Sequence, residues 1–163
     1  MDIYTTIDSP LGEILLAGDG TALTRVSFDV TSARAGRRRE PRAFAEAERQ
    51  LGAYFAGERT SFGLPLAARG SAFQERVWAE LARLPYGTTT SYGALAARIG
   101  VPPDRVRAVG AAIGANPLLV VLPCHRVVAA DGALTGYAGG LERKRELLTL
   151  EGVLQPALWS VMP

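Results

Sequence analysis

Apolar residues alternate with polar ones over three short runs at the start of the chain. Such alternation is typical of strands with one buried face, and turn residues such as Gly, Pro and Asp separate the runs. The expected strands are Asp2–Ile7, Glu13–Ala17 and Leu23–Phe28. Because the connections between them are short, the pattern predicts a small three-stranded antiparallel meander.

Helical spacing replaces this alternation further along the chain. Aromatic and aliphatic residues recur at helical intervals over Pro41–Ala56, and Gly57 closes that segment. A second helix is expected after Ser71, whose side chain caps it, and Pro85 stops it. The extended segment between these helices ends at Gly70, which we take as the boundary between an N-terminal domain (residues 1–69) and a C-terminal domain (residues 70–163).

Residues 92–115 have the layout of a helix-turn-helix. Tyr92–Ile99 is a short amphipathic segment, a turn with Gly and two Pro follows, and Asp104 is expected to cap a second helix that runs to about Gly114. Ordinary helical hairpins share this pattern, so the layout alone leaves both interpretations open.

The second helix carries an unusual set of residues outside its apolar stripe. These are Arg105, Arg107, Ala108 and Gly110, with further small residues after them. Glycine inside a helix costs about 1 kcal/mol relative to alanine, so its use indicates a close approach by something bulky. A neighbouring helix and a nucleic-acid backbone both satisfy this requirement.

The only cysteine and the only histidine of the chain are neighbours, Cys124 and His125. The aliphatic run Leu118–Leu122 leads into them and is expected to be a buried strand, which Pro123 ends. A thiol reacts as its thiolate, and a nearby imidazole is a common means of forming one near neutral pH. The alternative is a buried structural thiol, since free cysteine is among the most buried residue types.

Composition excludes several classes of protein. One cysteine cannot form an internal disulfide, which fits a reducing cytoplasm, and one Cys with one His cannot supply a structural zinc site, so we expect no metal and no cofactor. No stretch approaches the roughly twenty apolar residues of a membrane span, and the N-terminus lacks the features of a signal peptide.

Charge is unevenly distributed. The net charge of +2 divides into −1 over residues 1–68 (eight Arg against nine acids) and +3 over residues 69–163 (ten Lys and Arg against seven acids). Thr31–Arg42 is rich in arginine and has no apolar periodicity, which is typical of a solvated, mobile loop; the alternative is a loop that contacts phosphates. This charge is compatible with nucleic-acid binding but does not by itself indicate it.

A glycine-rich segment, Gly132–Gly140, follows the cysteine and is expected to pack over a pocket. Leu141–Leu150 is predicted to be the last helix, with Gly152 at its C-terminal end. The tail Pro156–Pro163 is expected to pack Leu158 and Trp159 on the body of the protein.

Several of these segments together resemble the O6-alkylguanine-DNA alkyltransferases. The resemblance covers residues 71–152 in order and the N-terminal part more loosely. The matching residues are Tyr92, Arg107-Ala108-Val109-Gly110, Asn116-Pro117, Pro123-Cys124-His125-Arg126-Val127, Gly136-Tyr137, Gly139-Gly140-Leu141 and Glu151-Gly152. The resemblance implies an α/β fold: an N-terminal domain with a small three-stranded antiparallel sheet and helices, then a mostly helical winged-helix domain with the helix-turn-helix.

The resemblance also implies a chemistry for the cysteine. Cys124 would accept the alkyl group, His125 would deprotonate it through a water molecule, and Glu151 would orient the imidazole. Asn116 would fix the turn that holds the nucleophile, and the Tyr92 hydroxyl would donate to guanine N3. Because no second thiol can resolve an S-alkylcysteine, each molecule would react once.

The partner implied is double-stranded DNA carrying O6-alkylguanine, and possible activity on O4-alkylthymine is left open. Arg107 would fill the space of the extruded base, Ala108 and Gly110 would permit close approach in the minor groove, and Gly93 and Arg105 would add contacts to DNA. The carbonyls of Val127 and Cys124 would read the base, Tyr137 would wall its pocket, and Ala138 stands where some family members have serine.

The expected protein is a cytoplasmic monomer that does not act on membranes. One alternative is a lesion-binding module that flips damaged bases without removing the alkyl group. Another is an unrelated Cys–His hydrolase, which is disfavoured because no oxyanion hole is evident and because the Arg107 helix would have no use.

Overall fold

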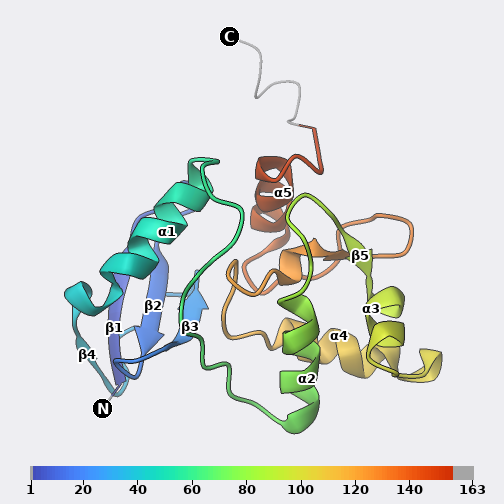
Figure 1. Ribbon diagram of the computed structural model, residues 1–163, viewed down its shortest axis with the longest axis horizontal. Helices are drawn as coiled ribbons and strands as arrows, with labels where there is room; N and C mark the ends of the chain where they lie inside the picture. The colour runs from blue at the N-terminus through green and yellow to red at the C-terminus, as the bar shows by residue number, and fades with distance from the viewer. Residues whose placement is uncertain (1, 156–163) are drawn as a thin grey trace.

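Four strands form a mixed sheet in the N-terminal part of the computed structural model, which describes residues 2–155 (Figure 1). Strands β1 (Asp2–Ile7), β2 (Ile14–Gly18) and β3 (Leu23–Ser27) make the predicted antiparallel meander. A fourth strand, β4 (Arg37–Arg39), pairs in parallel with β1 at the edge of the sheet. The prediction of three strands was therefore incomplete.

Strand β4 lies in the basic segment Thr31–Arg42, which was predicted to be a mobile loop. That prediction was wrong for residues 37–39. Backbone hydrogen bonds hold this strand to β1, and its side chains are largely exposed. Because it buries no apolar face, its sequence shows no alternating pattern. Charged residues on an edge strand also discourage pairing with another chain.

Helix α1 (Ala45–Phe55) lies across one face of this sheet (Figure 1). It continues from a 3-10 turn, η1 (Pro41–Phe44), so the single helix predicted over residues 41–56 is built in two parts. Phe44, Leu51 and Tyr54 are buried from this segment.

The C-terminal part is helical, as predicted. It contains α2 (Ala72–Leu81), α3 (Tyr92–Arg98), α4 (Val106–Gly114) and α5 (Leu141–Leu150). Ser71 caps α2 through a capping box with Gln74, which confirms its predicted role. Asp104 does not cap α4, because the 3-10 turn η2 (Pro103–Arg105) forms the start of that segment and the cap position falls on Arg105.

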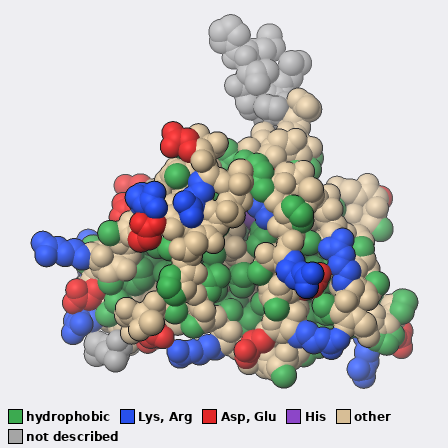
Figure 2. All heavy atoms as spheres, viewed as in Figure 1, with side chains coloured by type: hydrophobic (Ala, Val, Ile, Leu, Met, Phe, Trp, Pro, Cys, Tyr) green, Lys and Arg blue, Asp and Glu red, His purple; other side chains and the backbone are tan. Residues whose placement is uncertain are grey.

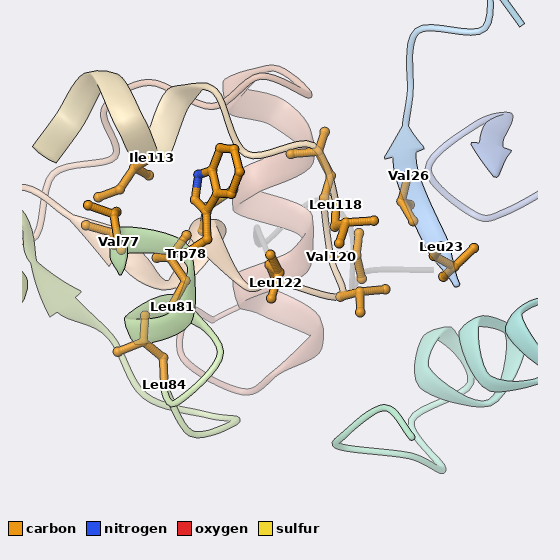
Figure 3. Packing of buried hydrophobic residues seen from close by; sticks show 14 of the residues in the cluster. Leu23, Val26, Val77, Trp78, Leu81, Leu84, Ile113, Leu118, Val120 and Leu122 are labelled. Carbon is orange, nitrogen blue, oxygen red and sulfur yellow. The ribbon is translucent and has the colours of Figure 1, made fainter. Parts of the chain in front are cut away.

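The aliphatic run Leu118–Leu122 is buried but is not a strand. It makes one isolated bridge, between Leu118 and Val26 of β3. Val121 N then donates to the Leu119 carbonyl at 2.8 Å, across a tight turn in which Val120 has a φ of 70°. The run is apolar because it is enclosed on all sides: Figure 3 shows Leu118, Val120 and Leu122 between Trp78 and Leu81 of α2 and Leu23 and Val26 of β3.

One hydrophobic core therefore extends across both halves of the chain. Its C-terminal part is completed by a short 3-10 turn, η3 (Cys124–Arg126), and by β6 (Val127–Val128), which pairs in parallel with β5 (Thr90–Ser91). The boundary at Gly70 stays a prediction. The segment Pro156–Pro163, with the packing predicted for Leu158 and Trp159, lies outside the described residues. None of the helices within residues 2–155 is sufficiently long and apolar to cross a bilayer.

Candidate active site

Two tight turns present the cysteine. Pro123, with φ −80° and ψ 64°, bends the chain so that Cys124 N donates to the Leu122 carbonyl at 2.8 Å. The buried Asn116 amide spans the same turn, donating from Nδ2 to the Leu122 carbonyl and accepting from Leu118 N, each at 2.9 Å. Asn116 thus ties both ends of the aliphatic run and holds the backbone in front of Cys124.

The Cys124 thiol is almost fully enclosed, with 4% of the residue exposed. Burial raises its pKa to about 11, although the Asn116 side chain and the positive charge of Lys144 act in the opposite direction. The thiol is therefore protonated at neutral pH, and reaction as a thiolate requires a base close by.

The neighbouring imidazole has the properties of that base. His125 is fully buried, and its Nε2 lies 2.8 Å from Oε2 of Glu151. Because an ionised carboxylate can only accept, Nε2 carries the hydrogen, and a neutral ring then has its lone pair on Nδ1. The Glu151 carboxylate acts to raise the pKa of His125, but burial outweighs it and lowers the pKa. The lowered pKa keeps the ring neutral.

Within residues 2–155, Nδ1 of His125 has no hydrogen-bond partner. A buried polar atom without a partner is unusual and costs free energy in the absence of a ligand. The free nitrogen belongs to the residue that follows Cys124 in the chain, so one short turn, η3, holds both a proton acceptor and a protonated thiol.

Glu151, which follows α5, is held by two more side chains. Arg126 forms a two-pronged ion pair, with Nε 2.8 Å from Oε1 and Nη2 3.0 Å from Oε2, and its Nη1 donates to the Leu84 carbonyl at 2.6 Å. The Tyr54 hydroxyl donates to Oε2 at 2.5 Å. Burial alone would raise the pKa of Glu151, but the hydrogen bonds from His125 and Arg126 lower it to about 2, so the carboxylate is charged at neutral pH.

Lys144, the only lysine of the chain, is buried beneath the site. Its ammonium donates to the carbonyls of Val127, Thr135 and Gly136 at 2.6, 2.7 and 3.1 Å. Burial lowers the pKa of Lys144 to about 8. These three bonds fasten the glycine-rich segment to the strand that follows Cys124.

The glycine-rich segment forms a wall beside the imidazole. The rings of Tyr137 and His125 are nearly perpendicular, with centroids 6.4 Å apart, and the Tyr137 hydroxyl is buried without a partner in the described part of the chain. Gly139 must be glycine, since a Cβ there would lie 2.6 Å from the Tyr137 ring and 2.9 Å from Phe28. Ala138, between them, is exposed.

Helices α3 and α4 present the other predicted residues at the surface. Arg105, Arg107, Ala108 and Gly93 are exposed, whereas Val109, Ala112 and Ile113 bury the opposite side of α4. Tyr92 is half-buried, and its hydroxyl donates to the carbonyl of Thr135 in the glycine-rich segment at 3.1 Å. A Cβ at the half-buried Gly110 would lie 3.9 Å from the Tyr92 ring, so α4 runs close beside it.

Positive charge does not by itself mark α4 as a binding surface. Figure 2 shows Lys and Arg side chains on both halves of one face of the molecule. Within residues 2–155, neither Arg105 in η2 nor Arg107 in α4 takes part in a side-chain hydrogen bond or ion pair, but the same is true of exposed arginines elsewhere, such as Arg34 and Arg98. In the same part of the chain, no three His, Cys, Asp or Glu side chains are grouped so that they could bind a metal ion.

Comparison with known proteins agrees with this geometry. Residues 3–68 match the ribonuclease-like domain, and residues 72–153 the DNA binding domain, of 6-O-methylguanine DNA methyltransferase. A methylated-DNA–protein-cysteine methyltransferase of Mycolicibacterium paratuberculosis is 54% identical over 157 residues, which cover 94% of each chain. The chain belongs to the 6-O-methylguanine DNA methyltransferase family.

Two further members of the family extend the comparison. The constitutive methylated-DNA–protein-cysteine methyltransferase of Bacillus subtilis is 43% identical over 162 residues, covering 94% of this chain and 97% of its own. The crystal structure of Mycobacterium tuberculosis OGT in complex with DNA matches with a TM-score of 0.87 at 51% identity, covering 91% of this chain and 92% of that one. The family resemblance expected from the motifs is thereby confirmed.

The structure brings Cys124, His125, Glu151, Asn116 and Val127 together as buried residues, packs the half-buried Tyr137 against them, and leaves Gly93, Arg105, Arg107, Ala108 and Ala138 at the surface. Sequence reasoning assigned no role to Arg126, Lys144 or Tyr54. The first two carried a signal, since Arg126 directly follows the Cys–His pair and Lys144 is the only lysine among many arginines. Tyr54 belongs to the segment Tyr54-Phe55-Ala56-Gly57, which is also typical of the family, but no signal linked it to Glu151, which lies 97 residues further along the chain.

Proposed function

We propose that this protein repairs O6-alkylguanine in double-stranded DNA by transferring the alkyl group to Cys124 in a single turnover. The observation that carries the proposal is that the turn η3 holds both a buried, protonated thiol and the free Nδ1 of His125, whose other ring nitrogen is held by an ionised carboxylate. This is a nucleophile, a base and an orienting group in sequence.

In the proposed reaction the Cys124 proton passes to His125 Nδ1 through a water molecule, and the sulfur attacks the alkyl carbon. The S–C bond forms as the bond from that carbon to O6 breaks, and the electron pair goes to the guanine. Tyr92 supplies a proton to guanine N3, offsetting the charge of the leaving base. In doing so its hydroxyl exchanges the Thr135 carbonyl for the base.

Helix α4 would enter the minor groove in this proposal. Arg107 would occupy the space of the flipped nucleotide, offsetting part of the few kcal/mol that flipping costs. Ala108 and Gly110 would let the backbone approach DNA, with Gly93 and Arg105 at the margins of the contact. Two facts support this surface: its arginines are exposed, and a family member at 51% identity has been crystallised with DNA.

The damaged base would lie between the Cys124 turn and the glycine-rich segment. The Cys124 and Val127 carbonyls would accept from its exocyclic amine, and Tyr137 and Ala138 would line the pocket. The Val127 carbonyl already accepts from Lys144, so the base would use its second lone pair. O4-alkylthymine is a second candidate substrate, and we propose that the protein acts in the cytoplasm as a monomer with domains at residues 1–69 and 70–163.

The product explains why turnover would stop. An S-alkylcysteine is a poor leaving group, and Cys124 is the only cysteine of the chain, so no second thiol can remove the alkyl group. One protein molecule would then repair one lesion.

The test is the mass of the intact protein and of its peptides after mixing with duplex DNA that contains one O6-methylguanine. We expect one methyl group on Cys124, saturating at one per protein, and none with undamaged duplex. The Cys124→Ser variant should bind the damaged duplex and gain no mass.

A second candidate function is the lesion-binding module that flips a base without chemistry. Tight binding of the damaged duplex by the native protein with no change in mass would favour it and overturn the proposal. The complete His125–Glu151 pair argues against it, because a module that only binds has no need of an oriented base.

A further inference from the structure

We propose that Tyr54 is a positioning residue for alkyl transfer, through which the N-terminal half of the chain holds the Glu151–His125 pair in place. The inference rests on the proposed function and adds to it a residue outside the helical half that bears Cys124.

The contact that carries the inference is a single short hydrogen bond. Tyr54 lies in the last turn of α1, is fully buried, and donates from its hydroxyl to Oε2 of Glu151 at 2.5 Å. That oxygen is also the one that faces His125 Nε2 at 2.8 Å. Tyr54 therefore acts on the carboxylate oxygen that orients the imidazole, rather than on a remote atom.

The ring of Tyr54 is fixed by aromatic neighbours. Its centroid lies 5.3 Å from that of Phe55 and 6.2 Å from that of Tyr86, both in edge-on arrangements, and 5.5 Å from that of Phe62. Edge-on packing at these distances is favourable and specific in geometry. The hydroxyl consequently has little freedom to leave Glu151.

The hydroxyl is also a permanent donor. Burial, and then the adjacent Glu151 carboxylate, raise the pKa of Tyr54 well above its usual value. The hydroxyl therefore stays protonated over the whole pH range in which the protein works.

Loss of this donor has a predictable sign. A hydrogen bond to a carboxylate withdraws negative charge from it, so without Tyr54 the Glu151 oxygen would stabilise an imidazolium more strongly. The pKa of His125 would rise, and a larger fraction of the base would be protonated at a given pH. The carboxylate would also be less firmly oriented.

Other titratable and charged groups lie around the same pair. They are Arg126 and Cys124 from the same turn, Lys144 on α5, Tyr137 on the glycine-rich segment and Tyr86 beside the Tyr54 ring. Tyr54→Phe alters none of them and keeps the ring.

Tyr86→Phe is the matched control. Tyr86 belongs to the same aromatic group, but its hydroxyl donates to the Leu150 carbonyl at 3.3 Å and not to Glu151. Each variant thus removes one hydroxyl from the same cluster, and only one of the two touches the carboxylate.

The first measurement is the rate of a single turnover of methyl transfer at saturating duplex, followed over pH. For Tyr54→Phe we expect the maximal rate to fall about tenfold and the acid limb to move to higher pH, with affinity for the damaged duplex unchanged within about twofold. Tyr86→Phe should match the native protein in both rate and pH profile.

The second measurement needs no substrate. His125 is the only histidine, so the imidazole signals in an NMR titration belong to it without further assignment. They should titrate at higher pH in Tyr54→Phe than in the native protein or in Tyr86→Phe.

A Tyr54→Phe protein with lower thermal stability but a native rate, a native acid limb and a native His125 titration would overturn the inference and leave Tyr54 a packing residue. Failure of the native protein to transfer a methyl group would instead overturn the proposed function. In that case the NMR titration alone still decides whether Tyr54 acts on the pair.

Discussion

The charged groups around Glu151 are buried and paired, whereas, in the described part of the chain, Arg107 on the outward surface of α4 is exposed and unpaired. Glu151 is buried and accepts hydrogen bonds from His125, Arg126 and Tyr54. Arg107 stands on an exposed surface among small residues and, within residues 2–155, has no ion-pair partner. A reacting centre gains from groups that need no rearrangement during the reaction, whereas a surface for a polyanion must leave its cations unpaired until the ligand arrives.

The buried cluster and the exposed surface thus suit two different tasks, chemistry and the recognition of DNA. The buried cluster is complete before any ligand binds, apart from His125 Nδ1 and the Tyr137 hydroxyl, the two buried side-chain atoms of the described residues that lack partners. The chemistry is thus prepared in advance, and recognition is left to be completed by DNA.

The change expected to have the largest effect is Glu151→Gln, which keeps the shape of the side chain and removes its charge. His125 would lose its orienting carboxylate and Arg126 its counterion in a buried site. Since general base catalysis contributes roughly 10²- to 10⁴-fold, we expect the single-turnover rate of methyl transfer to fall at least about 100-fold. Breaking a buried ion pair should also lower the free energy of unfolding by about 3–5 kcal/mol, as measured by urea denaturation.

Glu146→Gln is the matched control, because Glu146 is exposed on the same helix α5. It should leave both quantities unchanged. Equal effects of the two substitutions would mean that the buried charge has no special role.

The second expectation concerns the loss of folding stability at acid pH. The pKa of Glu151 is lowered from 4.5 to about 2 in the folded protein, so its contribution to stability is complete above about pH 4.5 and is lost as the pH falls toward 2. His125, whose pKa is lowered from 6.5, acts in the same direction from about pH 6.5 downward. The shift of Glu151 corresponds to about 3 kcal/mol at neutral pH.

Urea denaturation at a series of pH values measures this loss. Between pH 5 and pH 2 the curve for Glu151→Gln should be flatter than that of the native protein. A native curve as flat as that of the variant would show that the carboxylate is not held in its charged form.

The smallest expected effect is that of Arg107→Ala, which tests the exposed surface of α4. The free energy of unfolding should stay within about 0.5 kcal/mol, since the side chain is exposed and unpaired. Methyl transfer from duplex DNA should slow roughly tenfold, because the flipped base would lose the group that fills its place. Transfer from the free alkylated base should keep its native rate, and a parallel loss with both substrates would place Arg107 in the chemistry instead.

The helical half was the more predictable part of the fold. Apolar spacing and the Ser71 cap located α2, and similar spacing located α3, because each helix buries one stripe. The charged helix α5 was located with Gly152 at its end. Strand β4 escaped prediction because its pairing uses the backbone while its three arginines point to no core. The run Leu118–Leu122 was misread because complete enclosure produces the same apolar composition as a buried strand.

The site was predictable to the extent that its parts are adjacent in sequence. Cys124 and His125 are neighbours, so a nucleophile and its base could be suggested from the sequence, with a buried structural thiol as the alternative. Glu151 lies 26 residues beyond His125 and could be paired with it only through the family resemblance. Tyr54 reaches the same carboxylate from the opposite half of the chain, and no local pattern records a contact that only the folded core creates.

The enclosure of Cys124 also determines how well the thiol of the unreacted protein resists chemical damage. Burial raises the pKa of Cys124, so very little of the thiol is ionised at neutral pH. Peroxides and soluble electrophiles attack the ionised, accessible form, so they find almost nothing to react with. If the protein reacts once, as proposed, this burial would keep its only thiol intact until a damaged base is bound.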